Sequence, residues 1–386
     1  MDKNTVILSI TTTLFTLTIG LATIGLQFFF YGKVSDFYIA ILSSFYWVTS
    51  IAISPFWGAL SDVLGDRRNI LIITAIGSGI ILYLHTIFTN YWQIVFLRVL
   101  TALFASSYLP VSLALLTENV EKSKLGRLTS TYNFSRALGF FISGYIVSFI
   151  VYIFTDIWIF GFASLFMLIS SLFLLMINKN KKRRVGIQKG IHKAIKIPGR
   201  GYLKNKRGYI LVIALALRHI GLMGMYSIIF IYLTRVGIPK WVSSAISSFN
   251  TLTQMITMYF FGYIADKIGR KKVFTTGFFL SSLVPISFMI SNSIMLYSLS
   301  FVLLGISFAA LISGVTPFLR EISPEGKEAE ALSFLNIARG IGFIIGPIIA
   351  GILVSKYSYG AMFLSMFSIS FTGALLSLLV EETLKR

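Results

Sequence analysis

Long stretches without a charged residue restrict the fold of this sequence more than any other feature. Residues 6–31, 69–88, 156–177 and 358–380 contain no Lys, Arg, Asp or Glu, apart from Asp156 at the start of one stretch. About twenty consecutive apolar residues form a helix that can cross the hydrocarbon layer of a bilayer. Strands of a membrane barrel would be shorter and would alternate apolar with polar residues, and these stretches do not. The sequence therefore predicts an all-α membrane protein.

The composition supports this prediction, because only 12% of the 386 residues are charged, whereas a soluble domain has about 25%. Two six-helix bundles are predicted, residues 1–177 and 209–386, joined by a basic cytoplasmic linker, residues 178–208. The twelve predicted transmembrane helices are residues 6–31, 37–61, 69–88, 92–117, 128–154, 156–177, 209–234, 241–265, 272–291, 294–319, 331–354 and 358–380.

The basic residues predict the orientation. Nearly all of those outside the predicted helices lie in alternate loops, and the linker alone has twelve Lys or Arg and no acid. Positive residues collect on the cytoplasmic side, so both termini are expected there, in a multi-pass protein of the plasma membrane. The net charge of +20 is then explained by topology and by contact with anionic headgroups, and a nucleic-acid partner is not expected.

The two halves repeat at a spacing of 203 to 204 residues. Residues 58–68 read GALSDVLGDRR and residues 262–272 read GYIADKIGRKK. A second match aligns Asn133, Arg136 and Gly139 with Asn336, Arg339 and Gly342. Internal duplication in a helical membrane protein indicates a transporter with its solute site at the interface of the repeats.

Both copies of Gly-x-x-x-Asp-x-x-Gly-x-basic-basic resemble the signature of the major facilitator superfamily, and the resemblance covers essentially the whole chain. It implies two pseudo-symmetric bundles, alternating access, and a cytoplasmic motif that latches the outward-open state. A tight turn with positive-inside charge is the alternative reading of the motif. Asp66 stands where a basic residue is common, which would weaken the first copy. The motif residues are Gly58, Asp62, Gly65, Arg67, Arg68, Gly262, Asp266, Gly269, Arg270 and Lys271.

Each motif residue type has a physical role. We expect Gly58 and Gly262 to permit close approach of helices. Gly65 and Gly269 are expected to take positive φ in a tight turn. Asp62 is expected to lie near helix N-termini or basic partners, and the same holds for its repeat equivalent.

Polar residues inside the predicted helices are candidates for substrate binding or coupling, because charges at bilayer depth are costly and usually functional. The family resemblance implies a functional arginine at Arg98. Snorkelling or interhelical hydrogen bonding is the alternative for each. The candidates are Gln27, Arg98, Asn133, Arg136, Arg218, His219, Asn250, Gln254, Asn336 and Arg339.

All fourteen acids fall at predicted helix ends or in loops, which leaves His219 as the deep titratable candidate apart from tyrosines. Proton coupling is therefore an open possibility. Buried arginines without buried acids favour an anionic or polar substrate. The helix over residues 128–154 lacks the Gly-Pro of the family's antiporter signature. No cofactor, metal cluster or catalytic arrangement is recognisable, and we do not expect an enzyme.

The sequence thus predicts a monomeric secondary active transporter for a small organic solute. Efflux of drug-like, hydrophobic compounds and uptake of a polar or anionic metabolite remain alternatives. A non-transporting membrane sensor is the alternative from another functional class.

Overall fold

The computed structural model describes residues 3–117, 122–178, 206–323 and 328–382, and every regular element in these ranges is an α-helix. Contacts divide the chain into two units. Unit 1 comprises residues 1–29 and 45–196, and unit 2 comprises residues 30–44 and 197–386. Most of the predicted linker, residues 178–208, lies outside the described residues.

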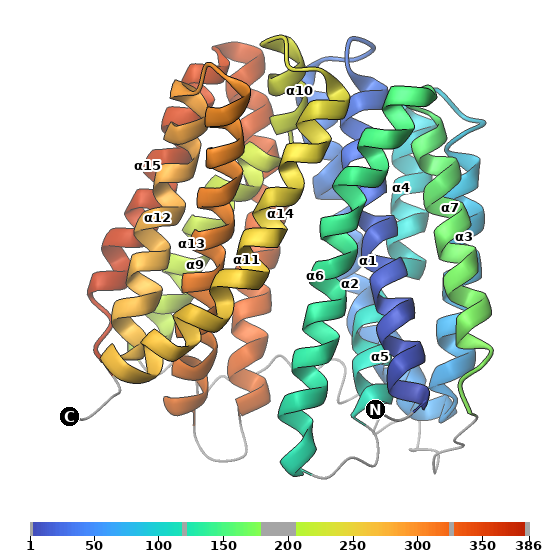
Figure 1. Cartoon of the computed structure of the whole chain (residues 1–386), viewed down its shortest axis with the longest axis horizontal. Coiled ribbons are helices and arrows are strands. Elements are labelled where there is room, and N and C mark those ends of the chain that lie inside the picture. Colours follow the sequence, from blue (N-terminus) through green and yellow to red (C-terminus); the bar gives the residue numbers. More distant parts are fainter. Residues whose placement is uncertain (1–2, 118–121, 179–205, 324–327, 383–386) are drawn as a thin grey trace. The chain divides into compact units, whose positions relative to one another are not determined.

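The helices of the first half are α1 (Lys3–Phe30), α2 (Asp36–Leu64), α3 (Arg67–Leu84), α4 (Tyr91–Ala105), α5 (Tyr108–Leu116), α6 (Lys122–Ile153) and α7 (Trp158–Leu174). Those of the second half are α9 (Lys206–Tyr226), α10 (Ile229–Arg235), α11 (Lys240–Ile268), α12 (Arg270–Ile290), α13 (Ile294–Glu321), α14 (Glu328–Lys356) and α15 (Tyr359–Leu378). Within each unit the long helices run side by side (Figure 1).

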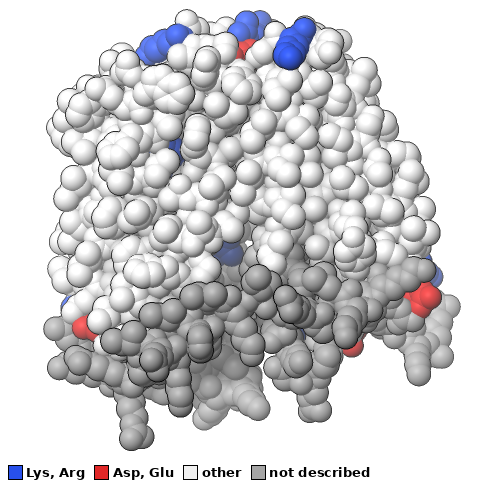
Figure 2. All heavy atoms as spheres, turned by 180° about the vertical axis from the view of Figure 1, so that it is seen from behind, with Lys and Arg blue, Asp and Glu red and all other residues white. Residues whose placement is uncertain are grey.

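Among the described residues, ten helical spans are long and apolar enough to cross a membrane. Two further predicted spans correspond to α7, which is apolar but has 17 residues, and to α11, which has 29 residues and many Ser, Thr, Asn and Gln side chains. Figure 2 shows the charged side chains near the two ends of one face, which is otherwise white apart from a few Lys or Arg atoms. This distribution suits a protein surrounded by lipid.

Two predicted continuous helices are each broken in the structure. The helix predicted over residues 92–117 divides into α4 and α5 at Ser106 and Ser107. Pro110 follows, and proline can neither donate to the carbonyl four residues earlier nor fit beside it. The helix predicted over residues 209–234 divides into α9 and α10 at Ser227, whose hydroxyl donates to the Gly224 carbonyl at 2.7 Å and so competes with the helical pattern.

In unit 1, helix α1 is mostly buried and hydrogen bonds tie it to two neighbours. The Thr13 hydroxyl donates to the Ser135 carbonyl of α6 at 3.1 Å, and the Thr18 hydroxyl donates to the Ala163 carbonyl of α7 at 3.3 Å. Helix α3 packs against α4 and α7. Small and hydroxylated residues thus hold these helices together, as is common where lipid removes the hydrophobic drive between helices.

In unit 2, helix α9 is the enclosed element and packs against α12, α14 and α15, while α13 packs against α11 and α12. The contact between α9 and α14 is unusually close. A Cβ added to Gly342 of α14 would lie 2.3 Å from the Cβ of His219, and one added to Gly346 would lie 2.5 Å from the Ile220 carbonyl oxygen. Glycine is therefore required where α14 crosses the middle of α9.

Helix α2 belongs to both units. Its first residues, up to Ser44, pack with unit 2, whereas the helix from Phe45 onward belongs to unit 1. The Ser44 hydroxyl donates to the Ile344 carbonyl of α14 at 2.8 Å, and Phe37 lies beside Gly351 of the same helix. The contacts thus divide the chain differently from the sequence repeat, which assigns all of α2 to the first bundle.

Candidate functional site

A buried arginine on α9 is the centre of the polar interior of unit 2. The side chain of Arg218 has no exposed surface. Its Nε donates a hydrogen bond of 2.9 Å to the Ser281 hydroxyl of α12, and one terminal nitrogen lies 3.2 Å from Nε2 of His219. The other terminal nitrogen is buried without a hydrogen-bond partner. Arg218 therefore has one buried donor group for which the described residues provide no acceptor.

The hydrogen bonds of His219 define its tautomer. Nδ1 lies 2.7 Å from the carbonyl oxygen of Leu215, which can only accept, so Nδ1 carries the proton. Nε2 faces a guanidinium nitrogen of Arg218, which can only donate, so Nε2 is the acceptor. His219 is thus a neutral ring with both nitrogens used, and it orients the guanidinium without balancing its charge.

A second arginine and an aromatic ring adjoin this pair. The guanidinium carbons of Arg218 and Arg339 lie 5.5 Å and 5.9 Å from the centroid of the Phe308 ring. Phe308 and Arg339 are half-buried, and Asn336, one turn before Arg339 on α14, is exposed. We call Arg218, His219, Ser281, Phe308 and Arg339 the arginine cluster. It extends from a fully enclosed guanidinium to an accessible face of α14.

Four acids of unit 2 have partners outside the arginine cluster. Asp36 pairs with Arg235, Asp266 and Glu321 pair with Arg270, and Glu382 accepts from the backbone of Lys271. These residues lie at helix ends. None of these four acids is a partner of Arg218.

Unit 1 contains a buried arginine of a different kind. Arg98 of α4 is 2% exposed, and its guanidinium carbon lies 4.3 Å from the centroid of the Tyr46 ring. Two of its nitrogens, Nε and one terminal nitrogen, have no hydrogen-bond partner, and neither does Nε2 of the buried His85. The Tyr46 ring is thus the principal contact of this cation.

Unit 1 also contains buried hydrogen bonds between hydroxyl groups. The Tyr108 hydroxyl donates to the Thr11 hydroxyl at 2.8 Å, and the Tyr108 ring stacks on Phe15 with centroids 4.1 Å apart. The hydroxyls of Ser112 and Tyr132 lie 2.7 Å apart. Phe15 is the repeat equivalent of Arg218 at a spacing of 203 residues, so the charge on α9 is a property of one half only.

The structure brings three of the predicted site residues, Arg218, His219 and Arg339, into one cluster. Arg136 is half-buried and Asn133 is exposed, as their equivalents on α14 are. Gln27 is buried in unit 1, and Asn250 and Gln254 of α11 are half-buried.

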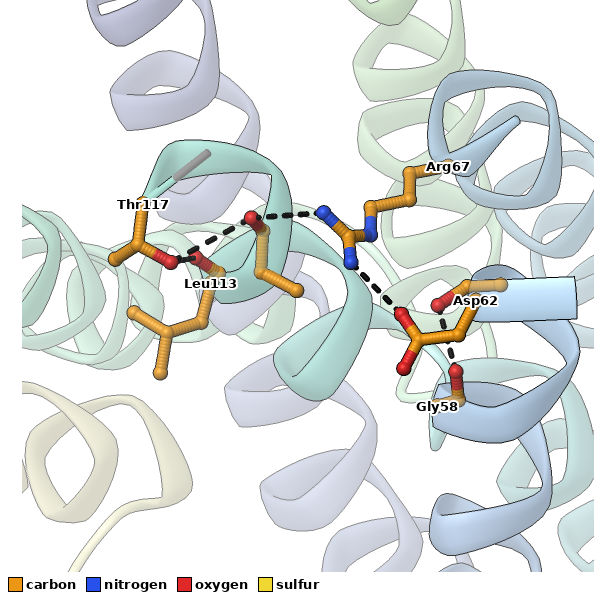
Figure 3. Close-up of polar contacts among 7 residues, drawn as sticks. Gly58, Asp62, Arg67, Leu113 and Thr117 are labelled. Atoms are coloured by element: carbon orange, nitrogen blue, oxygen red, sulfur yellow. Dashed lines mark hydrogen bonds and ion pairs between the residues drawn. The ribbon is translucent and has the colours of Figure 1, made fainter. Parts of the chain in front are cut away.

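The first copy of the signature motif forms a network at one end of unit 1 (Figure 3). Arg67 donates to the Asp62 carboxylate at 2.8 Å and to the Ala114 carbonyl of α5 at 3.2 Å. Arg68 donates to the carbonyls of Leu174 and Leu175, at the end of α7. The motif therefore ties the turn between α2 and α3 to the ends of two other helices.

Asp66, the departure from the usual motif, has its own role. Its side chain accepts from the backbone N–H of Asn69 at 3.1 Å and from the Asn69 amide at 2.7 Å, and it is the N-cap of α3. In the second copy the equivalent residue is Arg270, which pairs with Asp266 and, at 3.1 Å, with Glu321. The motif aspartate thus pairs with the second residue after the turn glycine in the first copy, Arg67, and with the first residue after it in the second copy, Arg270.

The glycines of the motif divide into two groups. Gly65 and Gly269 have φ of 65° and 109°, as expected of tight turns. The close helix contact expected at Gly58 and Gly262 is not formed within their own units, because a Cβ added to either would meet no described atom within 4 Å. Both lie on open faces of their helices, and the close contacts occur at other glycines, such as Gly342.

A family profile and several relatives match this chain. The sequence profile of the Major Facilitator Superfamily matches residues 5–252 and 241–386. This chain belongs to the Major Facilitator Superfamily. It is therefore an integral multi-pass membrane protein that transports a small molecule and is not an enzyme. Among the described residues no group of His, Cys, Asp and Glu could hold a metal ion.

Relatives within the Major Facilitator Superfamily include pumps for drugs. The multi-drug resistance efflux pump PmrA of Streptococcus pneumoniae is 24% identical over 335 residues, which are 85% of this chain and 82% of the pump. The quinolone resistance protein NorA of Staphylococcus aureus is 28% identical over 149 residues, 39% of this chain and 38% of NorA. The nucleoside transporter NupG has the same fold, with a TM-score of 0.83 over 98% of this chain and 99% of NupG at 16% identity.

Several contacts of this superfamily member lie beyond what the sequence analysis identified. Ser281 and Phe308 were not predicted, because single Ser and Phe residues in apolar helices do not stand out. Tyr46 beside Arg98 was missed for the same reason. Asp36 was placed at a helix end, but its partners, Arg235 and Tyr359, are too distant in sequence for any local pattern to indicate.

Proposed function

We propose that this protein is a secondary transporter that exports small organic compounds through the plasma membrane, with both termini in the cytoplasm. It binds the solute within the membrane and exposes it alternately to the two sides. It works as a monomer, and its basic cytoplasmic loops contact anionic lipid headgroups.

The observation that carries the solute site is the buried Arg218 with one unpartnered nitrogen. A cation inside a membrane protein is costly and is retained mainly where it serves a pathway or a ligand. Its neutral neighbours, Ser281 and His219, hold it in place and leave a donor for a bound molecule. A site of this kind within unit 2 supports solute binding by the C-terminal half.

The direction of transport is supported by the relatives. PmrA is described as an efflux pump and matches most of this chain, and NorA confers quinolone resistance and matches part of it. Export of organic compounds is therefore a better-supported proposal than uptake. The half-buried Phe308 beside two guanidinium groups suits compounds with an apolar or aromatic body.

Transport can be tested with purified protein in liposomes, against a panel of anionic, neutral and cationic organic compounds, with and without a pH gradient. We expect protein-dependent movement of at least one compound, and a lower rate for Arg218→Gln. If the folded protein moves none of them, as a non-transporting sensor would, the proposal fails. Export from cells that express the protein, compared with cells that do not, tests the direction.

The proposed orientation has an independent test, because the chain contains no cysteine and single cysteines can be introduced without background. Tyr357 and Lys272 are both exposed. A cysteine at residue 357 should react with an impermeant thiol reagent in intact cells, and one at residue 272 should react only after lysis. The reverse pattern would overturn the topology. The unmodified chain is the control.

A further inference from the structure

The arginine cluster of unit 2 concentrates positive charge around one aromatic ring. Arg218 and Arg339 come from different helices, α9 and α14, and both guanidinium carbons lie within 6 Å of the Phe308 centroid. Like charges this close repel each other in a medium of low dielectric constant. Their proximity needs a reason beyond packing, since Phe15, the repeat equivalent of Arg218, shows that the fold is also built without a cation at this position.

The contacts of Arg218 in the described part of unit 2 supply no balancing charge. The groups that bond Arg218 are a serine hydroxyl and a neutral histidine ring. The acids Asp36, Asp266, Glu321 and Glu382 have partners at the helix ends. A buried cation without a counter-charge is strongly destabilising, so an anion that entered the cluster would be stabilised by it.

The geometry also limits the kind of anion. Arg218 is fixed by Ser281 and His219, which leaves one terminal nitrogen unpartnered, and Phe308 offers an apolar surface beside it. Arg339 and Phe308 are half-buried and Asn336 is exposed, so the cluster reaches the surface of unit 2 on the α14 side. A carboxylate accepts well from a guanidinium, and an aromatic body would pack on the Phe308 ring.

We propose that the arginine cluster is the binding site for an organic anion, with the solute's carboxylate on Arg218 and its apolar or aromatic body against Phe308. Ser281 and His219 are positioning residues, which hold the guanidinium and do not contact the solute's charge. This inference rests on the proposed function, since it names the substrate class of the same site.

Binding by the purified wild-type protein gives the first test and needs no variant. The probes are 1-naphthoate, its neutral amide 1-naphthamide, and the cation 1-naphthylmethylamine, titrated by isothermal calorimetry at low and high salt. We expect the carboxylate to bind at least about ten-fold more tightly than the amide, as a charge-assisted hydrogen bond predicts, and more tightly at low salt. Equal affinity for carboxylate and amide, preference for the amine, or no binding of the carboxylate would each overturn the proposal.

Substitutions test whether Arg218 binds the carboxylate of naphthoate. Arg218→Gln should remove most of the preference for naphthoate over naphthamide. Lys356→Gln removes the same charge from an exposed position at the end of α14 and should leave that preference unchanged. If Arg218→Gln does not fold, Ser281→Ala tests the same site more gently, by freeing Nε of Arg218, and should weaken naphthoate binding about three- to ten-fold with little effect on naphthamide. A preference that is lost in Lys356→Gln as well, is retained in Arg218→Gln, or is unchanged from the wild type in Ser281→Ala contradicts the assignment.

The two proposals can fail separately. Selective binding of naphthoate in detergent, without movement of any compound in liposomes, would leave the anion site standing and refute the transport proposal. Transport of neutral or cationic compounds without any selectivity for naphthoate would refute the anion site and leave export standing.

Discussion

Arg235 donates a hydrogen bond of 2.8 Å to the Asp36 carboxylate, although the two residues are 199 positions apart in the chain. The other carboxylate oxygen accepts from the Tyr359 hydroxyl at 2.7 Å. Asp36 is the first residue of α2, and its partners lie on α10 and α15. This contact, together with the bond from Ser44 to Ile344, holds the first turns of α2 on unit 2, although the repeat assigns the whole helix to the other half.

Loss of this contact should release the start of α2. Arg235 is half exposed, so the pair contributes about 1 kcal/mol or less. With a single cysteine at the buried position 40, which faces Gly351, Asp36→Asn should raise the rate of thiol labelling a few-fold. Tyr359→Phe removes one hydrogen bond to the Asp36 carboxylate and leaves the ion pair with Arg235 in place, so it should act more weakly. An unchanged labelling rate in Asp36→Asn would show that apolar packing alone holds these turns.

Asp66 should be better for this chain than the basic residue usual in the family. Asp66→Arg removes the N-cap of α3, at a cost of about 1 kcal/mol, and gains nothing at Asp62, because Arg67 already pairs with it. We expect a lower thermal midpoint in Asp66→Arg and a nearly unchanged one in Asp66→Asn, which can still cap the helix. Tryptophan fluorescence on heating would measure both. A higher midpoint for the arginine variant would contradict this account.

Two glycines of unit 2 should respond in opposite ways to the same substitution. Gly342→Ala places a methyl group 2.3 Å from the Cβ of His219, and overpacking of this kind costs about 1–3 kcal/mol. Gly262→Ala fills open space within α11, where alanine is favoured over glycine by up to about 1 kcal/mol. The thermal midpoint should therefore fall in Gly342→Ala and rise in Gly262→Ala, relative to the wild type. A large loss in Gly262→Ala would restore the expectation of close helix contact there.

His219 should not be the carrier of a coupled proton. Its Nε2 accepts from Arg218, and protonation would replace that hydrogen bond with repulsion between two cations. Gln at this position can still accept from Arg218, so His219→Gln should transport at a reduced rate while keeping the wild-type response to an imposed pH gradient. Measurement in liposomes decides the matter. Transport that loses its response to the gradient in His219→Gln would assign the proton to this ring.

Local patterns were sufficient to predict much of this fold. The length of the apolar stretches located the helices, and the glycines at 65 and 269 indicated turns with positive φ. The breaks within two spans were missed, because Ser106, Ser107 and Ser227 are also common inside continuous membrane helices.

The candidate site could be predicted only in part. A charge inside an apolar stretch is conspicuous, so Arg218 and Arg339 were identified. Their shared neighbour Phe308 was not, because it depends on how α9, α13 and α14 pack. The partner of Asp36 was missed for a similar reason, since a pair separated by 199 positions leaves no periodic trace.

The two copies of the motif satisfy the same aspartate from different positions, through Arg67 in one and Arg270 in the other. A sequence pattern that compares residues position by position would score the first copy as a poor match. Its ion pair between Asp62 and Arg67 is nevertheless formed, and Asp66 is the N-cap of α3. Signatures of this kind are better written as a geometry that an acid and a base must reach than as a string of letters.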